Sequence, residues 1–179
     1  MNILITILLT LVGIIVLLLI IGLFLTKNFN IESNTVIKKS KTEVFNYVKF
    51  LKNNDQYNKW AMKDPNMKKV LTGTDGTVGF TYSWEGNREA GKGVQEIIKI
   101  IENERIDYAL HFEKPYKSTS YSSIILQSSL PEQTKVTWTF HGTMPYPFNV
   151  MFAVFGLGKM LNKDIANRWY NRFCFILGG

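Results

Sequence analysis

The densest group of polar side chains able to do chemistry stands at the end of a strand-like segment. Glu85, Asn87 and Arg88 follow residues 79–84, in which aromatic and hydroxyl side chains alternate. At the mouth of a cavity, these three side chains would orient a ligand headgroup or take part in acid–base chemistry. The same residues suit a turn between two strands, a position that requires no function. Both interpretations remain open from the sequence.

Other residue types that often act in catalysis lack the partner residues that a reaction needs. His111 and His141 are the only histidines, and strand alternation places both on the face opposite the aromatic residues, which predicts exposed positions. Cys174 is the only cysteine and has no identifiable base. No metal-ligand spacing, nucleophile elbow or phosphate loop is present. We therefore expect no metal, no cofactor and no catalytic residue.

The first 26 residues carry no charged side chain and predict a transmembrane anchor. A helix over residues 3–25 would be roughly 35 Å long, enough to cross a hydrocarbon core of about 30 Å. A cleaved signal peptide is the alternative. It is disfavoured because no basic residue precedes the apolar run, the run is long, and no A-x-A-like site follows it.

Basic residues gather just after this apolar run. Ten lysines and four carboxylates lie between Lys27 and Lys69, which gives this part a net charge of +6 out of +7 for the chain. Lysines beside a span favour the cytoplasmic side and are attracted to anionic lipids. A solvated basic face is the plainer interpretation. No nucleic-acid motif accompanies the charge, so we expect no nucleic-acid partner.

Behind the anchor, the pattern predicts an α+β domain. We divide the chain into an anchor (1–26), a short linker (27–33) and one domain (34–179). A capping box at Ser40 and Glu43 predicts a helix with an apolar stripe. Period-two alternation then predicts an antiparallel meander. Its expected strands are 34–37, 79–84, 91–101, 106–112, 121–130 and 136–140, and a long C-terminal helix is expected over 148–177.

This order of elements resembles the START-like SRPBCC superfamily, in its polyketide cyclase/dehydrase branch, and especially small bacterial members with an N-terminal span. The resemblance covers roughly residues 34–160. It rests on these residues: Val36-Ile37 with Ser40, Val44 and Phe45; Trp60 before Asp64-Pro65; Gly76-x-Val78-Gly79; Tyr82-x-Trp84-x-Gly86-Asn87; Gly91-x-Gly93; and Thr134-x-Val136-Thr137-Trp138 up to Met144-Pro145. The chain departs from the family in residues 168–179, which are aromatic and end on two glycines where relatives have a charged amphipathic helix.

The resemblance implies a helix-grip fold, in which a curved antiparallel sheet wraps around the long C-terminal helix and leaves an apolar cavity. The implied cavity wall is Phe80, Tyr82, Trp84, Tyr108, Leu110, Trp138 and Phe140, with Met151 and Phe155 from the helix. These side chains also suit an ordinary core. Four of them are Trp or Tyr, whose polar atoms need a partner when buried, and this favours water or a ligand near them.

The expected function is therefore that of a membrane-anchored, single-pass domain, facing the cytoplasm, that binds a lipid or other hydrophobic small molecule. One alternative is an enzyme of the cyclase/dehydratase type with Glu85 or Tyr82 as acid–base groups. Another is a protein-interaction module with no ligand. Aromatic residues crowd the segment 144–157, and we further expect this segment, through Phe148 and Phe152, to dip into the membrane interface.

Overall fold

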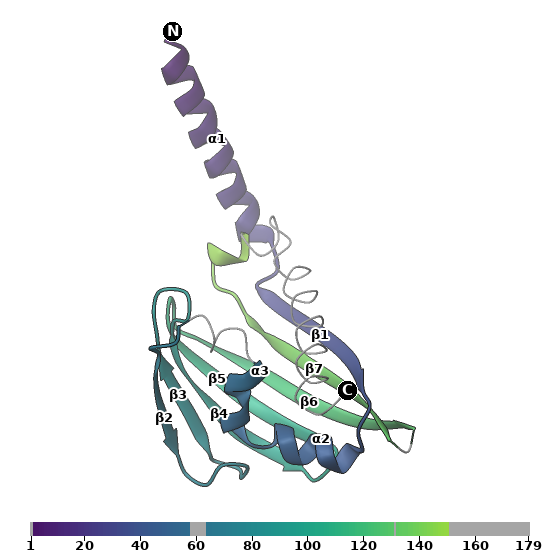
Figure 1. Ribbon diagram of the computed structural model, residues 1–179. Helices are drawn as coiled ribbons and strands as arrows, with labels where there is room; N and C mark the ends of the chain where they lie inside the picture. Colours follow the sequence, from purple (N-terminus) through teal and green to yellow (C-terminus); the bar gives the residue numbers. More distant parts are fainter. Residues whose placement is uncertain (1, 58–63, 131, 151–179) are drawn as a thin grey trace.

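A seven-stranded antiparallel sheet organises the domain, and an apolar helix projects from one end of it (Figure 1). The computed structural model describes residues 2–57, 64–130 and 132–150. The strand order is β1-β7-β6-β5-β4-β3-β2, so all neighbours are consecutive except β1 and β7. The elements are α1 (Ile3–Phe24), β1 (Asn28–Ile37), α2 (Lys41–Val48), η1 (Leu51–Asn53), α3 (Asn54–Tyr57), β2 (Lys68–Thr72), β3 (Thr81–Glu85), β4 (Lys92–Ile101), β5 (Arg105–Lys114), β6 (Ser118–Leu130) and β7 (Gln133–Thr143).

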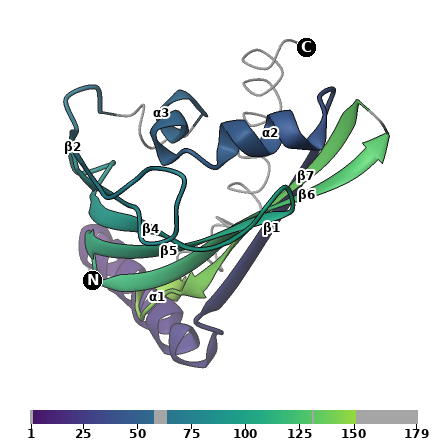
Figure 2. The same cartoon turned by 90° about the horizontal axis from the view of Figure 1, so that it is seen from below.

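The sheet is curved, and α2 and α3 both lie on its concave side (Figure 2). This is the α+β architecture of a helix-grip fold, as the sequence predicts. Residues 148–150, at the start of the expected C-terminal helix, are helical. The rest of that expected helix, with Met151, Phe152 and Phe155, lies outside the described residues, and so does Trp60.

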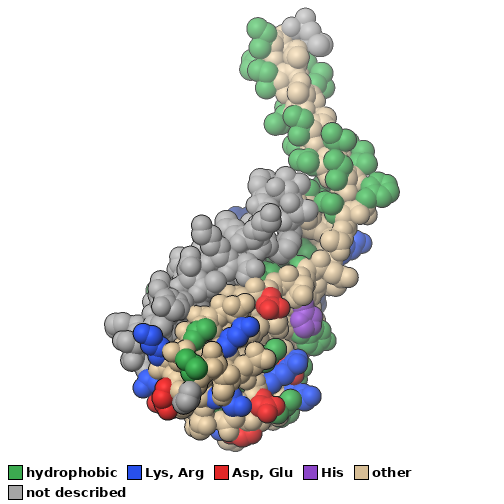
Figure 3. Space-filling model, turned by 90° about the vertical axis from the view of Figure 1, so that its right-hand side faces the viewer, with side chains coloured by type: hydrophobic (Ala, Val, Ile, Leu, Met, Phe, Trp, Pro, Cys, Tyr) green, Lys and Arg blue, Asp and Glu red, His purple; other side chains and the backbone are tan. Residues whose placement is uncertain are grey.

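Helix α1 has the length and composition of a membrane span. Its 22 residues carry no charge, and Gly22 is its only buried residue. At 1.5 Å per residue the helix is about 33 Å long. Figure 3 shows hydrophobic side chains along its whole length, whereas the adjoining face of the domain carries lysine, arginine and acidic side chains. Apart from Gly22, no residue of α1 is buried, and the helix is long and apolar enough to cross a membrane.

The first strand is longer than the sequence predicts. β1 begins at Asn28, six residues before the expected start, so most of the expected linker is strand. Its polar sequence hides the alternation, because Ser33 and Thr35 share the inner face with Ile31 and Ile37. The strand is held by pairing with β7 over its full length, from Asn28 opposite Thr143 to Ile37 opposite Thr134. Only residues 25–27 separate it from α1.

Helix α2 begins where the capping box predicts. The Ser40 hydroxyl accepts a hydrogen bond from the Glu43 backbone N–H at 3.4 Å and donates one to the Glu43 carboxylate at 3.1 Å. This contact, with the nearby Lys39, keeps the pKa of Glu43 below its usual value. The first bond satisfies a backbone N–H that the first helical turn leaves without a partner, and the second bond links the two side chains. The start of α2 is therefore fixed by local chemistry.

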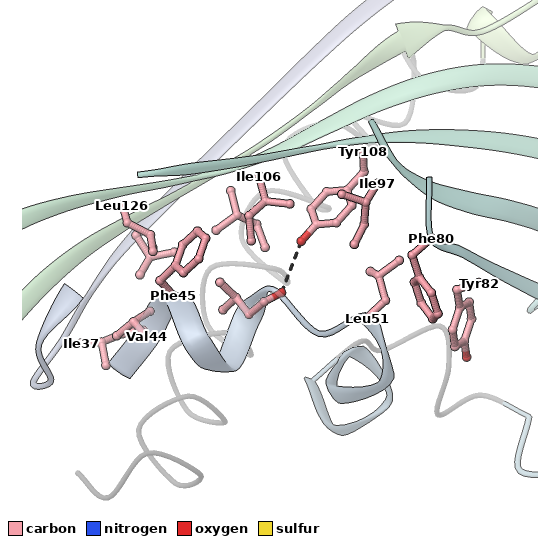
Figure 4. Packing of buried hydrophobic residues seen from close by; sticks show 13 residues of the cluster. Ile37, Val44, Phe45, Leu51, Phe80, Tyr82, Ile97, Ile106, Tyr108 and Leu126 are labelled. Atoms are coloured by element: carbon pink, nitrogen blue, oxygen red, sulfur yellow. Dashed lines mark hydrogen bonds between the residues drawn. The ribbon is translucent and has the colours of Figure 1, made fainter. Parts of the chain in front are cut away.

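The core lies between α2 and the sheet. Val44, Phe45 and Val48, on one face of α2, are fully buried. They belong to one cluster with apolar side chains of six strands and with Leu51 of η1 (Figure 4). Burying each such side chain contributes about 1.5–3 kcal/mol. The cluster also contains Phe80, just before β3, and the strand residues Ile37, Tyr82, Ile97, Ile106, Tyr108, Ile124, Leu126 and Val136.

Strand β2 was not predicted from the sequence. All five of its residues are exposed, and it forms the outer edge of the sheet next to β3. An exposed edge strand has no buried face, so its sequence shows no alternation. Lys68 and Lys69 at its start are typical of strand edges that are protected by charge.

A clasp joins the end of α1 to the segment that follows β7. The Asn149 side chain is 2% exposed, and its amide donates hydrogen bonds to the carbonyls of Gly22 at 2.8 Å and Leu25 at 3.4 Å. The Met144 backbone N–H also donates to the Lys27 carbonyl at 2.7 Å. We call these three bonds the Asn149 clasp. It satisfies carbonyls at the end of α1 that the helix itself leaves free.

Candidate ligand-binding site

Cross-strand register shows which side chains share the concave face. Tyr108 of β5 belongs to the core under α2, and its hydroxyl donates to the Val48 carbonyl at 3.4 Å. It lies opposite Ser122 of β6, which in turn lies opposite Phe140 of β7. Residues directly opposite each other in a sheet point to the same face. Ser122 and Phe140 therefore face the same side as α2.

Helix α2 follows the end of β1 at Ile37, so it covers the end of the sheet away from α1. The concave surface nearer α1 carries a different set of side chains. We call it the proximal concave surface and define it by Trp84, Leu110, Ser120, Ser122, Trp138 and Phe140. It adjoins the core, because Trp84, Leu110 and Trp138 pack against the core cluster while remaining only partly buried.

The aromatic side chains of this surface are held by specific contacts. The Trp84 indole N–H donates to the Ala90 carbonyl at 3.1 Å, and its ring meets Phe112 edge-on. Trp138 and Phe140 stack at 5.6 Å between ring centroids with an interplanar angle of 16°. Phe29 of β1 adds a second ring beside Phe140 at 5.2 Å. These half-buried rings form two walls, one on β3 and one on β7.

Between the walls, β6 carries small hydroxyl side chains. Ser120 and Ser122 are 3% and 4% exposed, and Ser120 lies between Leu110 and Gly142 in register. A Cβ at position 142 would stand 2.5 Å from the Ser120 hydroxyl oxygen, so only glycine leaves room for it. Neither serine was predicted as a site residue: Ser120 precedes Tyr121, where this strand was expected to begin, and Ser122 lies within the expected strand as an ordinary polar residue. Their register opposite Tyr108 and Leu110 is what places them on the concave face.

Glycine also shapes the Trp84 wall. Gly93 of β4 lies opposite Trp84, and a Cβ there would come within 2.7 Å of the indole ring and of the His111 carbonyl. The indole therefore lies flat across β4 in the space that a side chain would occupy. Gly93 belongs to the Gly91-x-Gly93 pair on which the family resemblance rests in part, and the close approach of Trp84 explains why this position needs glycine.

Of the predicted wall residues, Phe80, Tyr82 and Tyr108 are core residues. They are 2%, 5% and 2% exposed and pack beneath α2, η1 and neighbouring strands. Trp84, Leu110, Trp138 and Phe140 lie together on the proximal concave surface. The predicted helix residues Met151 and Phe155 lie outside the described residues. Their role in ligand binding stays a prediction, as it does for the whole set.

The protein supplies partners for polar atoms that the sequence analysis assigned to water or a ligand. The Tyr82 hydroxyl donates to Asp55 at 2.6 Å, and Lys69 binds the other oxygen of that carboxylate at 2.8 Å. Burial, followed by the contact with Asp55, raises the pKa of Tyr82 well above its usual value. The Trp84 and Tyr108 partners are the backbone carbonyls already described. The argument from unsatisfied polar atoms is therefore wrong for these three residues.

The polar group at the end of β3 is a turn held by its own side chains. The Asn87 side chain accepts hydrogen bonds from the Glu89 and Ala90 backbone N–H groups, at 2.9 and 3.0 Å. Its own backbone N–H donates to Asp64 at 2.6 Å. Asn87 thus has a structural role as a turn residue.

The neighbouring charges are at the surface. Glu85 is exposed and pairs with Lys114 at 3.3 Å and Lys92 at 3.7 Å, contacts that lower its pKa. Arg88 is exposed as well. A ligand role for Glu85, Asn87 and Arg88 stays a prediction; Glu85 ends β3, and the other two lie on the loop that follows it.

The two histidines are exposed, as predicted. His111 lies beside the Thr119 hydroxyl at 3.1 Å, and His141 stacks on Tyr121. Both belong to the outer, convex face. Across residues 2–57, 64–130 and 132–150 no cluster of three His, Cys, Asp or Glu side chains is placed to hold a metal. Cys174 lies outside these ranges.

At the end of the sheet nearest α1, aromatic side chains gather at the surface. Tyr116, in the β5–β6 loop, stacks on Phe148 at 4.6 Å. Tyr146 and Phe148 are 38% and 37% exposed, although both flank the Asn149 clasp. The structure thus places Phe148 beside the end of α1. Its insertion into a membrane stays a prediction.

Comparison with known proteins gives the fold. No family model matches the chain, and no curated protein matches it in sequence. Among solved structures, the hypothetical protein jhp0584 from Helicobacter pylori has a TM-score of 0.60 and 10% identity, over 83% of this chain and 86% of that one. Norcoclaurine synthase from Thalictrum flavum, in complex with dopamine and hydroxybenzaldehyde, has a TM-score of 0.57 and 11% identity, over 83% and 90%.

A third similar structure is the Mll3558 protein from Rhizobium loti, with a TM-score of 0.55 and 16% identity, over 79% of this chain and 96% of that one. At such low identity the likeness is one of fold. The chain shares with these three proteins its fold, which is a curved antiparallel sheet with helices on its concave side.

Proposed function

We propose that this protein is a membrane-anchored domain that binds a lipid or another hydrophobic or amphipathic small molecule on its proximal concave surface. The observation that carries the proposal is the composition of that surface. Trp84, Leu110 and Trp138 remain only partly buried although they adjoin a fully packed core. Apolar burial is the main driving force in such sites, and a few polar groups fix the orientation of the ligand.

The position of the surface supports the membrane part of the proposal. It lies at the end of the sheet where α1 enters, and the Asn149 clasp fixes that end to the helix. In a bilayer, a ligand leaving the lipid phase would meet this end of the domain first. Lys27, Lys38, Lys39 and Lys41 follow the span closely, and we propose on this ground that the domain faces the cytoplasm.

Fold-level likeness supports small-molecule binding in general terms. Norcoclaurine synthase has the same fold and holds dopamine and hydroxybenzaldehyde in its crystal structure. That protein is an enzyme by name, but a shared fold does not transfer an activity. Membership of the polyketide cyclase/dehydrase branch likewise rests only on the resemblance in sequence.

The described residues do not favour an enzyme with Tyr82 or Glu85 as acid–base groups. A raised pKa keeps the Tyr82 phenol protonated, and its hydroxyl already donates a hydrogen bond to Asp55. A lowered pKa keeps Glu85 ionised, and two lysines hold it at the surface. Neither group is poised to exchange a proton near neutral pH.

Native mass spectrometry of the full chain, released from lipid nanodiscs and from detergent, tests the proposal. We expect a co-purified hydrophobic mass bound at a fixed stoichiometry. Leu110→Trp should lower the bound fraction, because it fills the space between the two aromatic walls. His111→Trp is the matched control, since it adds the same ring to the exposed, opposite face of the same strand.

Two results would contradict the proposal. One is a mass without ligand that persists after exposure to a lipid extract, which would turn attention to a protein partner. The other is equal ligand loss in Leu110→Trp and His111→Trp, which would place any bound lipid away from the proximal concave surface.

A further inference from the structure

Three aromatic side chains gather at the end of the domain where α1 joins it. Tyr116 lies in the loop between β5 and β6, whereas Tyr146 and Phe148 follow β7. The rings of Tyr116 and Phe148 stack at 4.6 Å between centroids, and Tyr146 and Phe148 are 38% and 37% exposed. We call these three residues the junction cluster. A group of exposed aromatic rings held in place by stacking indicates a surface that contacts something outside the chain.

Contacts with Gly22 fix the level of this cluster along α1. A Cβ at position 22 would meet the Val150 side chain and the Tyr146 ring, so both pack directly against this glycine. Gly22 precedes the end of α1 at Phe24 by two residues, or about 3 Å along the helix axis. The segment after β7 therefore lies beside the last turn of the apolar helix, as Figure 1 shows, and not beyond its end.

The Asn149 clasp suits a place where water is scarce. The Asn149 amide, which is itself buried, donates to the carbonyls of Gly22 and Leu25. At the end of a helix in water, the solvent bonds such carbonyls. In the outer part of a bilayer the protein must supply the donor, because an unbonded carbonyl is unfavourable there. A buried side chain with this role indicates that the end of α1 and the junction cluster lie at the edge of the hydrocarbon.

The exposed side chains near this junction change from apolar to charged, as side chains do at a membrane surface. Leu23 and Phe24 are 61% and 87% exposed. Lys27 follows within three residues and is exposed as well, and so is Lys117, directly after Tyr116. Aromatic rings beside lysines are typical of the headgroup layer, where the rings lie among the lipids and the ammonium groups reach the water.

We propose that the junction cluster inserts among the phospholipid headgroups of the bilayer that α1 spans, and so forms a second membrane contact. This inference rests on the membrane anchor of the proposed function. It adds the β5–β6 loop, through Tyr116, to the single segment expected from the sequence. β6 begins at Ser118, directly after this loop, and Ser120 of the proximal concave surface follows two residues later. The contact therefore holds that surface close to the lipid from which its ligand would come.

Photocross-linking of the full chain in phosphatidylcholine nanodiscs tests this proposal. The photoreactive residue p-benzoylphenylalanine replaces Tyr116 or Phe148, a change that keeps an aromatic ring at each position. Intact-mass spectrometry measures the fraction of protein that gains the mass of one lipid, and fragmentation of the adduct locates the new bond within the lipid. We expect bonds to the glycerol and to the upper acyl chains, which lie at the depth of inserted aromatic rings.

Two exposed leucines serve as matched controls for the same probe. Leu130 is 58% exposed and ends β6, about 40 Å from the β5–β6 loop along the strand. Leu11 is 55% exposed and lies near the middle of α1. The probe at Leu11 should bond to acyl chains, whereas the probe at Leu130 should give only background. We expect the probes at Tyr116 and Phe148 to exceed that background about fivefold, because inserted rings remain in contact with lipid.

Three results would overturn the inference alone. The first is a lipid adduct at Tyr116 and Phe148 no higher than at Leu130, although Leu11 reacts. The second is bonding only to choline methyl groups, which would place the rings above the lipids. The third is a product with the mass of two protein chains, which would show that a second copy covers the cluster. A missing adduct at Leu11 would instead overturn the membrane anchor, and with it both the proposed function and this inference.

Discussion

Two glycines in α1 offer a matched test of the Asn149 clasp. Gly22 packs against the clasp: a Cβ there would stand 2.2 Å from Val150 Cγ2 and 3.4 Å from the Tyr146 ring. Gly13 lies in the same helix, and a Cβ there would meet no atom within 4 Å. We therefore compare Gly22→Ala with Gly13→Ala.

The size of the effect follows from these contacts. Adding a methyl group where no space exists costs about 1–3 kcal/mol, since Val150 must move. Alanine in place of glycine also stabilises a helix by about 0.5–1 kcal/mol. We expect Gly22→Ala to weaken the clasp by about 1–2 kcal/mol, or about 5- to 30-fold in the closed-to-open ratio. Gly13→Ala should leave the clasp unchanged.

Hydrogen exchange measures the ratio directly. In the clasp, the Met144 backbone N–H donates to the Lys27 carbonyl, so its exchange requires the clasp to open. In nanodiscs, Gly22→Ala should speed exchange of peptides covering residues 144–150, while peptides of β5 exchange as in the wild-type protein. Equal exchange at 144–150 in the two variants would refute the reasoning and would mean that α1 and the domain move independently.

Three further predictions concern the domain. Ser40→Ala should lower the free energy of unfolding by about 1 kcal/mol, seen as a lower Tm, because the first turn of α2 loses its cap; an unchanged Tm would contradict it. Gly93→Ala should displace the Trp84 indole, change its fluorescence and weaken ligand capture, and unaltered emission would show that the strand adjusts instead. The pKa of Tyr82 is raised in the folded protein, so the folded state favours the neutral phenol. The contribution of this phenol to the free energy of unfolding is complete below pH 10.0 and is lost progressively as the pH rises above it. The Tm should therefore fall at alkaline pH, and Tyr82→Phe, which cannot ionise or bond Asp55, should show a smaller fall; parallel pH curves would contradict this.

Much of the fold could be predicted because local sequence patterns determine it. The capping box at Ser40 fixes the start of α2, and period-two alternation locates β3, β4, β5 and β7 to within a few residues. β1 and β2 illustrate the limit. The inner face of β1 includes Ser33 and Thr35, and β2 has no inner face at all, so pairing with a distant strand decides both.

The candidate site was predictable only in part, for the same reason. Alternation correctly groups Trp138 with Phe140, but it does not show that Tyr82 finds Asp55, 27 residues earlier in the chain. It also gives no reason to select Ser120 and Ser122, because serine is common on exposed strands. Their position on the proximal concave surface follows only from the register of β6 with β5 and β7.

The Asn149 clasp also has a mechanical consequence. A helix about 33 Å long fits a thicker bilayer when upright and a thinner one when tilted. A flexible tether would absorb such a tilt, but here the end of α1 is bonded to residues 144–149, and β1 begins within three residues. Any tilt of α1 must therefore rotate the sheet as a rigid body. The thickness of the surrounding bilayer would set the angle at which the Trp84 and Trp138 walls face the lipid headgroups.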